Sequence, residues 1–270
     1  MSNQVYCSLF FKLGHPCMHY EFLIPILLIV GFVAGAVDTI AGGGGLITVP
    51  VLMSLGLPPA VALGTNRMQS CMGELSASLH FLKKKMLNLS DSKWGVFYTA
   101  LGSSLGSILI QYIHMNLARK IIPWLLLGVI LYTFLSPKIA DEDVQKRMST
   151  HVFYFLFGLG IGFYNGFFGP GTGSFWIFAF MLFAGLNIVS STMHAKPLNF
   201  IGNVASLLWF VMGGNVSYLL AIAMGVGQIM GARLGARIVI SNGAALIRPF
   251  YLTMVTLLTL SLFLKELGVL

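Results

Sequence analysis

GAVDTIAGGGGLITVP, residues 35–50, places an aspartate and four consecutive glycines inside a long apolar stretch. Glycine is a poor helix former, so Gly42–Gly45 predict a break, with a short helix beginning again at Leu46. Irregular backbone survives inside hydrocarbon only where protein or a water-filled cavity surrounds it. The restarted helix would present free N–H groups and its positive dipole end to that interior, which favours an anion.

The composition is typical of a polytopic membrane protein. Of 270 residues, 57% are hydrophobic and 9% are charged, whereas a soluble domain is about 25% charged. We attribute the net charge of +8 to basic cytoplasmic loops and expect no nucleic-acid partner. Cys7, Cys17 and Cys71 show neither metal-ligand spacing nor a disulfide framework, so no cofactor or metal is expected.

A membrane-spanning helix needs about 20 mostly apolar residues. Windows of that length predict segments near 22–40, 44–57, 60–82, 95–114, 119–137, 152–168, 173–187, 191–213, 216–238 and 247–264. The second and seventh segments are short, and each follows a glycine cluster. Ala34-Gly35-Ala36 resembles a signal-peptidase site, but we reject cleavage because the surrounding sequence recurs later in the chain.

Three blocks recur in the same order, which predicts a duplicated unit. GAVDTIAGGGG (35–45) matches GFYNGFFGPGTG (162–173), with Asp38 opposite Asn165. RMQSCMGELSAS (67–78) matches KPLNFIGNVASL (196–207), which places Arg67 on Lys196 and Glu74 on Asn203. GSSLG (102–106) matches GQIMG (227–231).

The number of crossings per unit decides the symmetry. If all five segments of a unit cross the membrane, the second unit is inverted relative to the first. If the short segment is re-entrant, four segments cross and the two repeats are parallel. If every segment crosses and Lys83–Lys85 lie inside, ten Lys and Arg residues fall inside and four outside. This bias favours an inverted arrangement with both termini outside. Eight full spans plus two short hairpin segments remain an alternative.

We therefore expect an all-α membrane protein with two homologous repeats, 8–10 transmembrane segments and glycine-broken helices. The expected parts are an N-terminal tail (1–21), a first repeat (22–137), a cytoplasmic connector (138–150), a second repeat (151–265) and a C-terminal tail (266–270). The expected location is a bacterial inner membrane, with the C-terminus periplasmic.

The second half repeats the glycine break as Gly169-Pro170-Gly171-Thr172-Gly173. Broken helices in both halves of a membrane protein point to a transporter site. The alternative is that these glycines only permit tight helix crossing, although packing motifs normally space glycines by four. That spaced pattern occurs at Gly102/Gly106 and at Gly227/Gly231/Gly235, which we interpret as packing faces.

Ionisable residues inside apolar segments are costly and usually functional. Arg67 and Lys196 occupy matching places, and Arg67 shares a helix face with Glu74, two turns away. They could form a shared anion site with His194. Two alternatives stay open: an internal salt bridge of Arg67 with Glu74 that only fixes packing, and snorkelling of Arg67 and Lys196 to the interface.

At these residues the chain resembles the TauE/SafE family, also called the toluene-sulfonate uptake permeases, and within it the YfcA-type branch. The motifs are GFVAGAVDTIAGGGGLITVP (31–50), ALGTNRMQS (62–70), GFYNGFFGPGTGSF (162–175) and HAKPLN (194–199). The resemblance implies a permease with seven or eight spans that moves sulfite, sulfoacetate or other organosulfur anions. Asn165 stands where YfcA-like chains can carry an acidic residue, which leaves Asp38 unmatched.

The leading interpretation is a secondary transporter of small anions, with Asp38 or Glu74 as carrier of a coupling proton. A passive anion channel is the alternative, although no repeated ring of charge or carbonyls is evident. An intramembrane hydrolase using Ser174 and His194 is a remote one. The predicted substrate site comprises Asp38, Thr39, Gly42, Gly43, Gly44, Gly45, Asn66, Arg67, Gln69, Glu74, Asn165, Gly169, Gly171, Gly173, His194, Lys196, Asn199 and Asn203.

Overall fold

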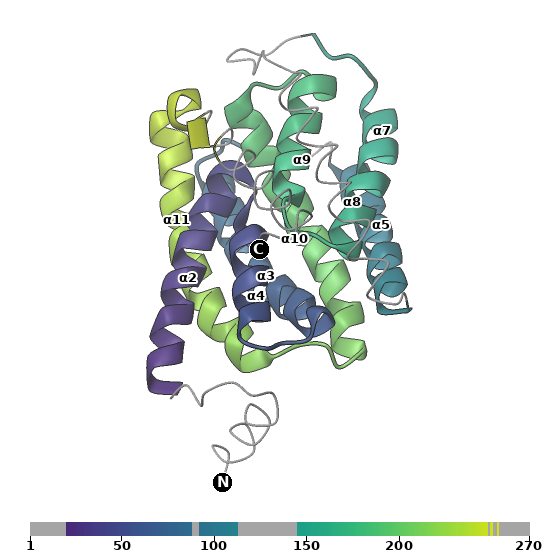
Figure 1. The fold of residues 1–270 in the computed structure, drawn as a ribbon. Coiled ribbons are helices and arrows are strands. Elements are labelled where there is room, and N and C mark those ends of the chain that lie inside the picture. The colour runs from purple at the N-terminus through teal and green to yellow at the C-terminus, as the bar shows by residue number, and fades with distance from the viewer. Residues whose placement is uncertain (1–19, 88–91, 113–144, 248, 251–252, 254–270) are drawn as a thin grey trace.

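The computed structural model describes residues 20–87, 92–112, 145–247, 249–250 and 253, and within them every regular element is a helix (Figure 1). The helices are α2 (Tyr20–Ala41), α3 (Gly44–Ser54), α4 (Pro59–Lys83), α5 (Lys93–Tyr112), α7 (Thr150–Phe153), η1 (Tyr154–Gly158), α8 (Leu159–Phe167), α9 (Thr172–Ala179), η2 (Phe180–Ala184), α10 (Ile188–Met212) and α11 (Tyr218–Asn242). The all-α expectation is confirmed for this part of the chain. Segments 119–137 and, apart from a few residues, 247–264 lie outside it, as do most residues of the predicted tails and connector.

Local sequence explains where several helices begin and end. Pro58 and Pro59 start α4, as expected for proline in a first turn. The Asn187 side chain caps α10 by accepting a hydrogen bond from the Ser190 amide at 2.9 Å. At the far end of α10, Gly214 adopts a φ of +68° in the turn that leads to α11.

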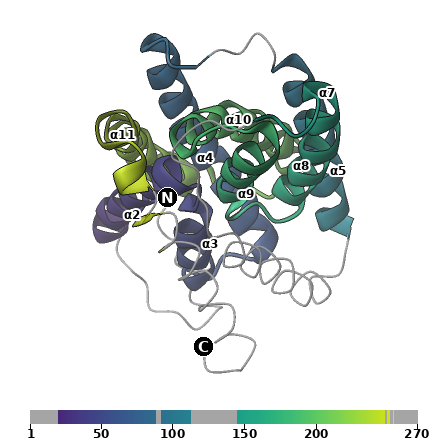
Figure 2. The ribbon, with the colours of Figure 1, turned by 90° about the horizontal axis from the view of Figure 1, so that it is seen from above.

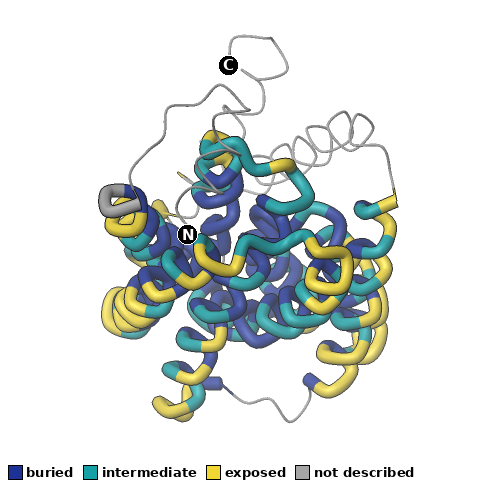
Figure 3. Tube along the Cα trace, turned by 90° about the horizontal axis from the view of Figure 1, so that it is seen from below, coloured by how far each residue is buried: buried dark blue, intermediate teal, exposed yellow. Residues whose placement is uncertain are grey.

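Many polar side chains are buried in the bundle, and many apolar ones are exposed. Figure 3 shows how burial is distributed along the described chain. Ile29, Phe97 and Met230 are 61%, 56% and 54% exposed, whereas Lys196 and Ser103 are fully buried. α2, over Leu23–Ala41, and α11 are long and apolar enough to cross a membrane. This distribution suits hydrocarbon surroundings, where polar groups must find partners within the protein.

The short helices α3 and α9 fold back along the helices that precede them. Leu52, near the end of α3, shares a core cluster with Leu27, near the start of α2. In the second half, the rings of Phe157 and Phe183 lie 4.7 Å apart, which brings the end of η2 back to η1. Each pair is a re-entrant hairpin, so the arrangement in which every segment crosses does not describe these residues.

The remaining helices pack as α2 against α11 and α5 against α8, with α4 and α10 between these pairs (Figures 1 and 2). An added Cβ at Gly231 would collide with the Phe32 carbonyl, and one at Gly102 with the Leu159 carbonyl. The predicted role of the spaced glycines in close helix packing is therefore confirmed.

α4 and α10 run antiparallel. Gly64 near the start of α4 lies against Phe210 near the end of α10, and the Ser217 amide beyond that end donates to the Thr65 hydroxyl at 2.9 Å. Their middles meet at the centre of the molecule, beside the two glycine breaks.

Candidate anion site at the helix breaks

The two glycine breaks touch each other at the centre of the bundle. A Cβ on Gly42 would collide with the backbone of Gly173, so these two chain segments are in van der Waals contact. Gly42 has a φ of +77° and Gly171 a φ of +84°, a region that side chains other than glycine rarely adopt. The glycines thus turn the chain sharply and let the N-terminal ends of α3 and α9 approach.

Asp38 anchors the first break. Its Oδ1 accepts a hydrogen bond from the Gly44 amide at 3.1 Å, at the start of α3. Its Oδ2 forms an ion pair with Lys196 Nζ at 3.1 Å, and the same ammonium donates to the Asp38 main-chain carbonyl. A carboxylate is therefore held between a helix N-terminus and a buried cation.

Asn165 has the corresponding place at the second break. Its Oδ1 accepts from Arg67 Nη1 at 3.0 Å and from the Thr172 hydroxyl, at the start of α9, at 3.3 Å. Arg67 Nη2 donates to the Asn165 main-chain carbonyl. The layout repeats that of the first break, with a neutral amide where Asp38 has a carboxylate.

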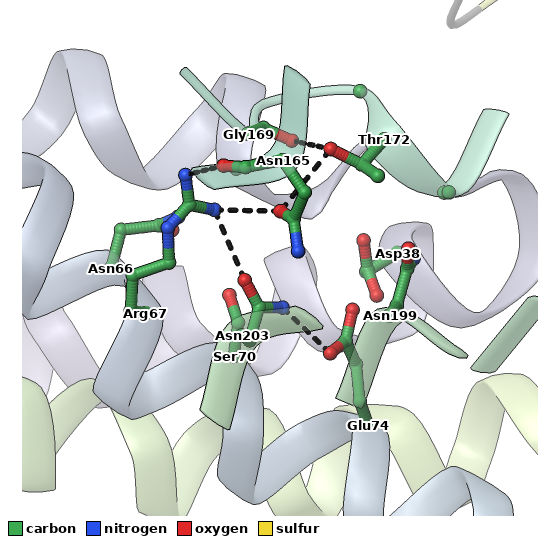
Figure 4. A pocket seen from close by; sticks show the side chains of 14 residues that line it. Asp38, Asn66, Arg67, Ser70, Glu74, Asn165, Gly169, Thr172, Asn199 and Asn203 are labelled. Carbon is green, nitrogen blue, oxygen red and sulfur yellow. Dashed lines mark hydrogen bonds between the residues drawn. The ribbon is translucent and has the colours of Figure 1, made fainter. Parts of the chain in front are cut away.

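One amide links Arg67 to Glu74. Arg67 Nη1 donates to Asn203 Oδ1 at 3.0 Å, and Asn203 Nδ2 donates to Glu74 Oε2 at 2.7 Å (Figure 4). Among the described residues, Lys196–Asp38 is the ion pair found, so Arg67 and Glu74 are not in direct contact as ions. The predicted alternative of an Arg67–Glu74 salt bridge is wrong.

The snorkelling alternative is wrong as well. Arg67 is 1% exposed and Lys196 is fully buried. A Cβ on Gly169 would collide with the Arg67 guanidinium, so this side chain lies directly on the second glycine break. Both cations point into the bundle centre and not toward an interface.

A small pocket lies between these groups. It has room for about one water molecule. Its lining includes most of the predicted site residues (Figure 4): Asp38, Gly42, Gly45, Asn66, Arg67, Glu74, Asn165, Gly169, Gly171, Gly173, Asn199 and Asn203. Ser70 and Thr172 also line it; Thr172 belongs to the predicted second break, whereas Ser70 was not predicted. Ser70 is three residues after Arg67 and four before Glu74, so helical spacing could have identified it.

The other predicted residues lie outside this lining. Gly43 caps α3, Gly44 binds Asp38, and Lys196 sits behind Asp38. Gln69 donates to Asn66 Oδ1 at 3.1 Å and thus supports a lining residue. The Thr39 hydroxyl donates to the Gly35 carbonyl within its own helix at 2.8 Å.

His194 and Ser174, the pair that the hydrolase alternative requires, also have structural contacts. His194 Nδ1 lies 2.8 Å from the Ser190 carbonyl, and its ring lies 5.8 Å from that of Phe180. The Ser174 hydroxyl donates to the Ala41 carbonyl at 2.6 Å and so ties the second break to the first.

Three polar atoms of the lining residues have no hydrogen-bond partner within the described part of the chain: Arg67 Nε, Asn165 Nδ2 and Asn199 Oδ1. Asn165 is 1% exposed, and Figure 4 shows its amide nitrogen pointing into the pocket. Buried polar groups normally have partners, so these atoms are available to a water molecule or to a polar ligand in the pocket.

The family model described as "Sulfite exporter TauE/SafE" matches residues 27–262. The chain belongs to the TauE/SafE family. As a TauE/SafE protein it is a membrane transporter, in agreement with the resemblance seen in its motifs and with the names of its relatives.

Three relatives illustrate how much of this TauE/SafE protein is shared. "Probable membrane transporter protein YfcA" of Escherichia coli (strain K12) is 45% identical over 227 residues, 84% of each chain. "Probable membrane transporter protein" of Haemophilus influenzae is 46% identical over 237 residues, 88% of this chain and 93% of the relative. "Probable membrane transporter protein ORF9" of Sinorhizobium sp is 38% identical over 227 residues, 84% of this chain and 87% of the relative. No solved structure gives a significant match.

Proposed function

We propose that this protein is a secondary transporter of small anions, with sulfur oxyanions such as sulfite and sulfonates as the substrate class. The observation that carries the proposal is the environment of Arg67. This buried guanidinium has amide and carbonyl partners but no carboxylate in ion-pair contact. A buried charge without a counter-ion is costly, and a bound anion would supply one.

The asymmetry between the two breaks supports this location. At the first break Asp38 provides a resident carboxylate between Lys196 and the N-terminus of α3. At the second break Arg67 and the N-terminus of α9 face an amide. A substrate oxyanion near Asn165 Nδ2 would supply the negative charge at the second break that the Asp38 carboxylate supplies at the first.

The sulfur assignment comes from the description of the family, "Sulfite exporter TauE/SafE". The donors present suit that chemistry. A sulfite or sulfonate group has three oxygens, and a guanidinium can bind two of them side by side. The Asn165 amide offers a further donor.

A transporter mechanism also requires movement. The pocket holds about one water molecule, and a sulfonate group is larger. We infer that loading separates the α2–α3 hairpin from the α8–α9 hairpin, which now close over the site through Gly42 and Gly173.

Equivalent contacts in the two halves support inverted repeats over 22–137 and 151–265. Lys196 binds the Asp38 carbonyl as Arg67 binds the Asn165 carbonyl, and α4 and α10 run antiparallel. Each hairpin returns to its own side and makes no net crossing. With α4, α5 and the predicted segment 119–137, a repeat would cross three times, and an odd number inverts the second repeat.

The contacts also refine the alignment of the repeats. Gly102 lies against Leu159 as Gly231 lies against Phe32, and Gly106 lies against Phe163 as Gly235 lies against Ala36. We therefore pair Gly102 with Gly231, one helical turn later than the sequence blocks suggested. The offset of 129 is then the same as that between Arg67 and Lys196.

A binding and flux experiment tests the proposal. Purified protein is heated in detergent with sulfite, isethionate, methanesulfonate, acetate or chloride, and exchange of the stabilising anion is then followed in liposomes. We expect stabilisation by a sulfur oxyanion that is lost in Arg67→Ala and reduced in Arg67→Lys. Counterflow is the uphill uptake of labelled anion in exchange for an excess of unlabelled anion inside the liposomes. It distinguishes a transporter from a channel. Absence of both stabilisation and flux for every anion would contradict the proposal.

A further inference from the structure

Glu74 is a buried carboxylate that the proposed anion contacts do not use. It is 3% exposed and lines the pocket. Figure 4 shows its carboxylate directed into the pocket, toward Asp38. Its hydrogen bond from Asn203 Nδ2 is 2.7 Å long. The second carboxylate of the site therefore faces the space where the substrate would bind.

The two carboxylates are held differently. Asp38 accepts a hydrogen bond from the Gly44 amide, at a helix N-terminus, and pairs with the Lys196 ammonium. Glu74 has no cation within ion-pair distance in the described part of the chain. Of the two, Glu74 is the carboxylate without a cation in direct contact among the described residues.

Several charged or titratable groups surround Glu74. Asp38 faces it from α2, Lys196 faces it from α10, and Arg67 and Cys71 lie on its own helix α4. Arg67 and Lys196 carry two positive charges, and Asp38 and Glu74 carry two negative charges when ionised. With Glu74 ionised the empty site is neutral, and a bound monoanion would leave it with one excess negative charge.

We infer that Glu74 carries a proton that is loaded together with the anion. This inference rests on the proposed anion transport. On loading, a proton from the open side bonds to a Glu74 carboxylate oxygen while the anion binds at Arg67, and the occupied site is again neutral. On the other side both leave, and Glu74 is ionised again. The protonated carboxyl also gains an O–H donor for an oxygen of the anion.

The charge balance predicts one proton for each monoanion. The transported pair is then electrically neutral, so a pH gradient drives it and a membrane voltage does not. One unit of pH gradient can concentrate the anion by up to about tenfold, which corresponds to about 1.4 kcal/mol.

Accumulation in liposomes tests the assignment. The probes are isethionate and methanesulfonate, sulfonates that stay ionised across the pH range used, so the substrate's own protonation does not contribute. We expect the wild-type protein to move the probe from the acidic to the alkaline side of the liposome membrane and to concentrate it there. Glu74→Gln, of equal size and without a titratable group, should exchange the probe in counterflow but not accumulate it.

Glu74→Asp is the matched variant, since it keeps a carboxylate and should keep accumulation. Infrared difference spectra give an independent readout: the probe should induce a protonated-carboxyl band that Glu74→Gln lacks and Glu74→Asp shifts. Accumulation by Glu74→Gln at the wild-type level would overturn the assignment. Wild-type exchange that ignores a pH gradient would overturn proton coupling and leave anion transport standing. Failure of every anion to bind or exchange would remove both.

Discussion

At the scale of single residues, the site depends on a one-atom difference between matching positions. Asp38 and Asn165 occupy corresponding places at the two breaks, and each binds the cation of the opposite half. A carboxylate neutralises Lys196, whereas an amide leaves the charge of Arg67 without a direct counter-ion. The chemistry of the pocket follows from this difference and from the second carboxylate, Glu74.

Asn165→Asp tests this difference with almost no change in volume. The new carboxylate should form an ion pair with Arg67 and fill the place proposed for the substrate oxyanion. We expect anion affinity to fall by at least about tenfold, about 1.4 kcal/mol, with the fold retained. Calorimetry or thermal stabilisation with the anion identified for the wild-type protein measures the loss. Wild-type affinity in this variant would mean that the anion does not bind at Arg67.

Sequence reasoning predicted which residues of the candidate site lie close together, but not which of them are in contact. Matching spacing in two halves was enough to place Asp38, Asn165, Arg67 and Lys196 together, because ionisable residues in hydrocarbon must face a common interior. It could not show that each cation crosses to the other half. That pairing depends on the antiparallel contact of α4 and α10, which local spacing does not encode.

At the scale of elements, the two re-entrant hairpins create the site. Each needs a sharp turn at its glycine break, and the two turns must touch. The sequence predicted the first break but not its extent. Only Gly42 and Gly43 lie between the helices, and α3 begins at Gly44 rather than at Leu46 as predicted. The direction of the short helices was not predictable, because an apolar segment of 11 residues can continue forward or return with equal local propensity.

Gly42→Ala tests the contact between the hairpins. Gly42 has a φ of +77°, and an added Cβ would collide with Gly173. We expect a destabilisation of more than about 1 kcal/mol, because alanine at positive φ is strained and the hairpins must separate. Gly160→Ala is the matched control, since its Cβ would meet nothing within 4 Å and alanine favours a helix by about 1 kcal/mol. Thermal unfolding in detergent compares them; equal unfolding temperatures would contradict a tight contact at Gly42.

At the scale of the whole molecule, the described basic residues outside the site gather at one end of the bundle. They lie at the end of α4, before and at the start of α5, ahead of α7 and near the end of α11: Lys83, Lys84, Lys85, Lys93, Lys146, Arg147, Arg233 and Arg237. Arg67 and Lys196 lie at the centre instead. By the positive-inside rule we expect that basic end to lie in the cytoplasm.

This orientation predicts the sides of the chain ends. A hairpin begins and ends on the same side of the membrane, as two full crossings do. The ends of the chain therefore lie on the same sides as in the arrangement with ten crossings, and the C-terminus is still expected outside. Fusions of a C-terminal reporter that works only in the periplasm should be active, and those of a cytoplasmic reporter inactive. The opposite pattern would mean that the segment 247–264 does not cross or that the bundle is inserted upside down.

Alternating access would require the two hairpins to separate, and a disulfide bond between them tests this requirement. An added Cβ at Gly45 would lie 3.4 Å from Pro170 Cβ, close to the Cβ separation of about 3.8 Å in disulfides. Gly45→Cys combined with Pro170→Cys, in a chain whose native cysteines are replaced by serine or alanine, should form a bond that holds α3 to the second break. If the hairpins must part to load the anion, oxidation should abolish flux in liposomes and reduction should restore it. The two single-cysteine variants should respond to neither treatment, which separates the bond from the substitutions. Undiminished flux in the oxidised double variant, with the bond verified by mass spectrometry, would show that the path opens elsewhere in the bundle.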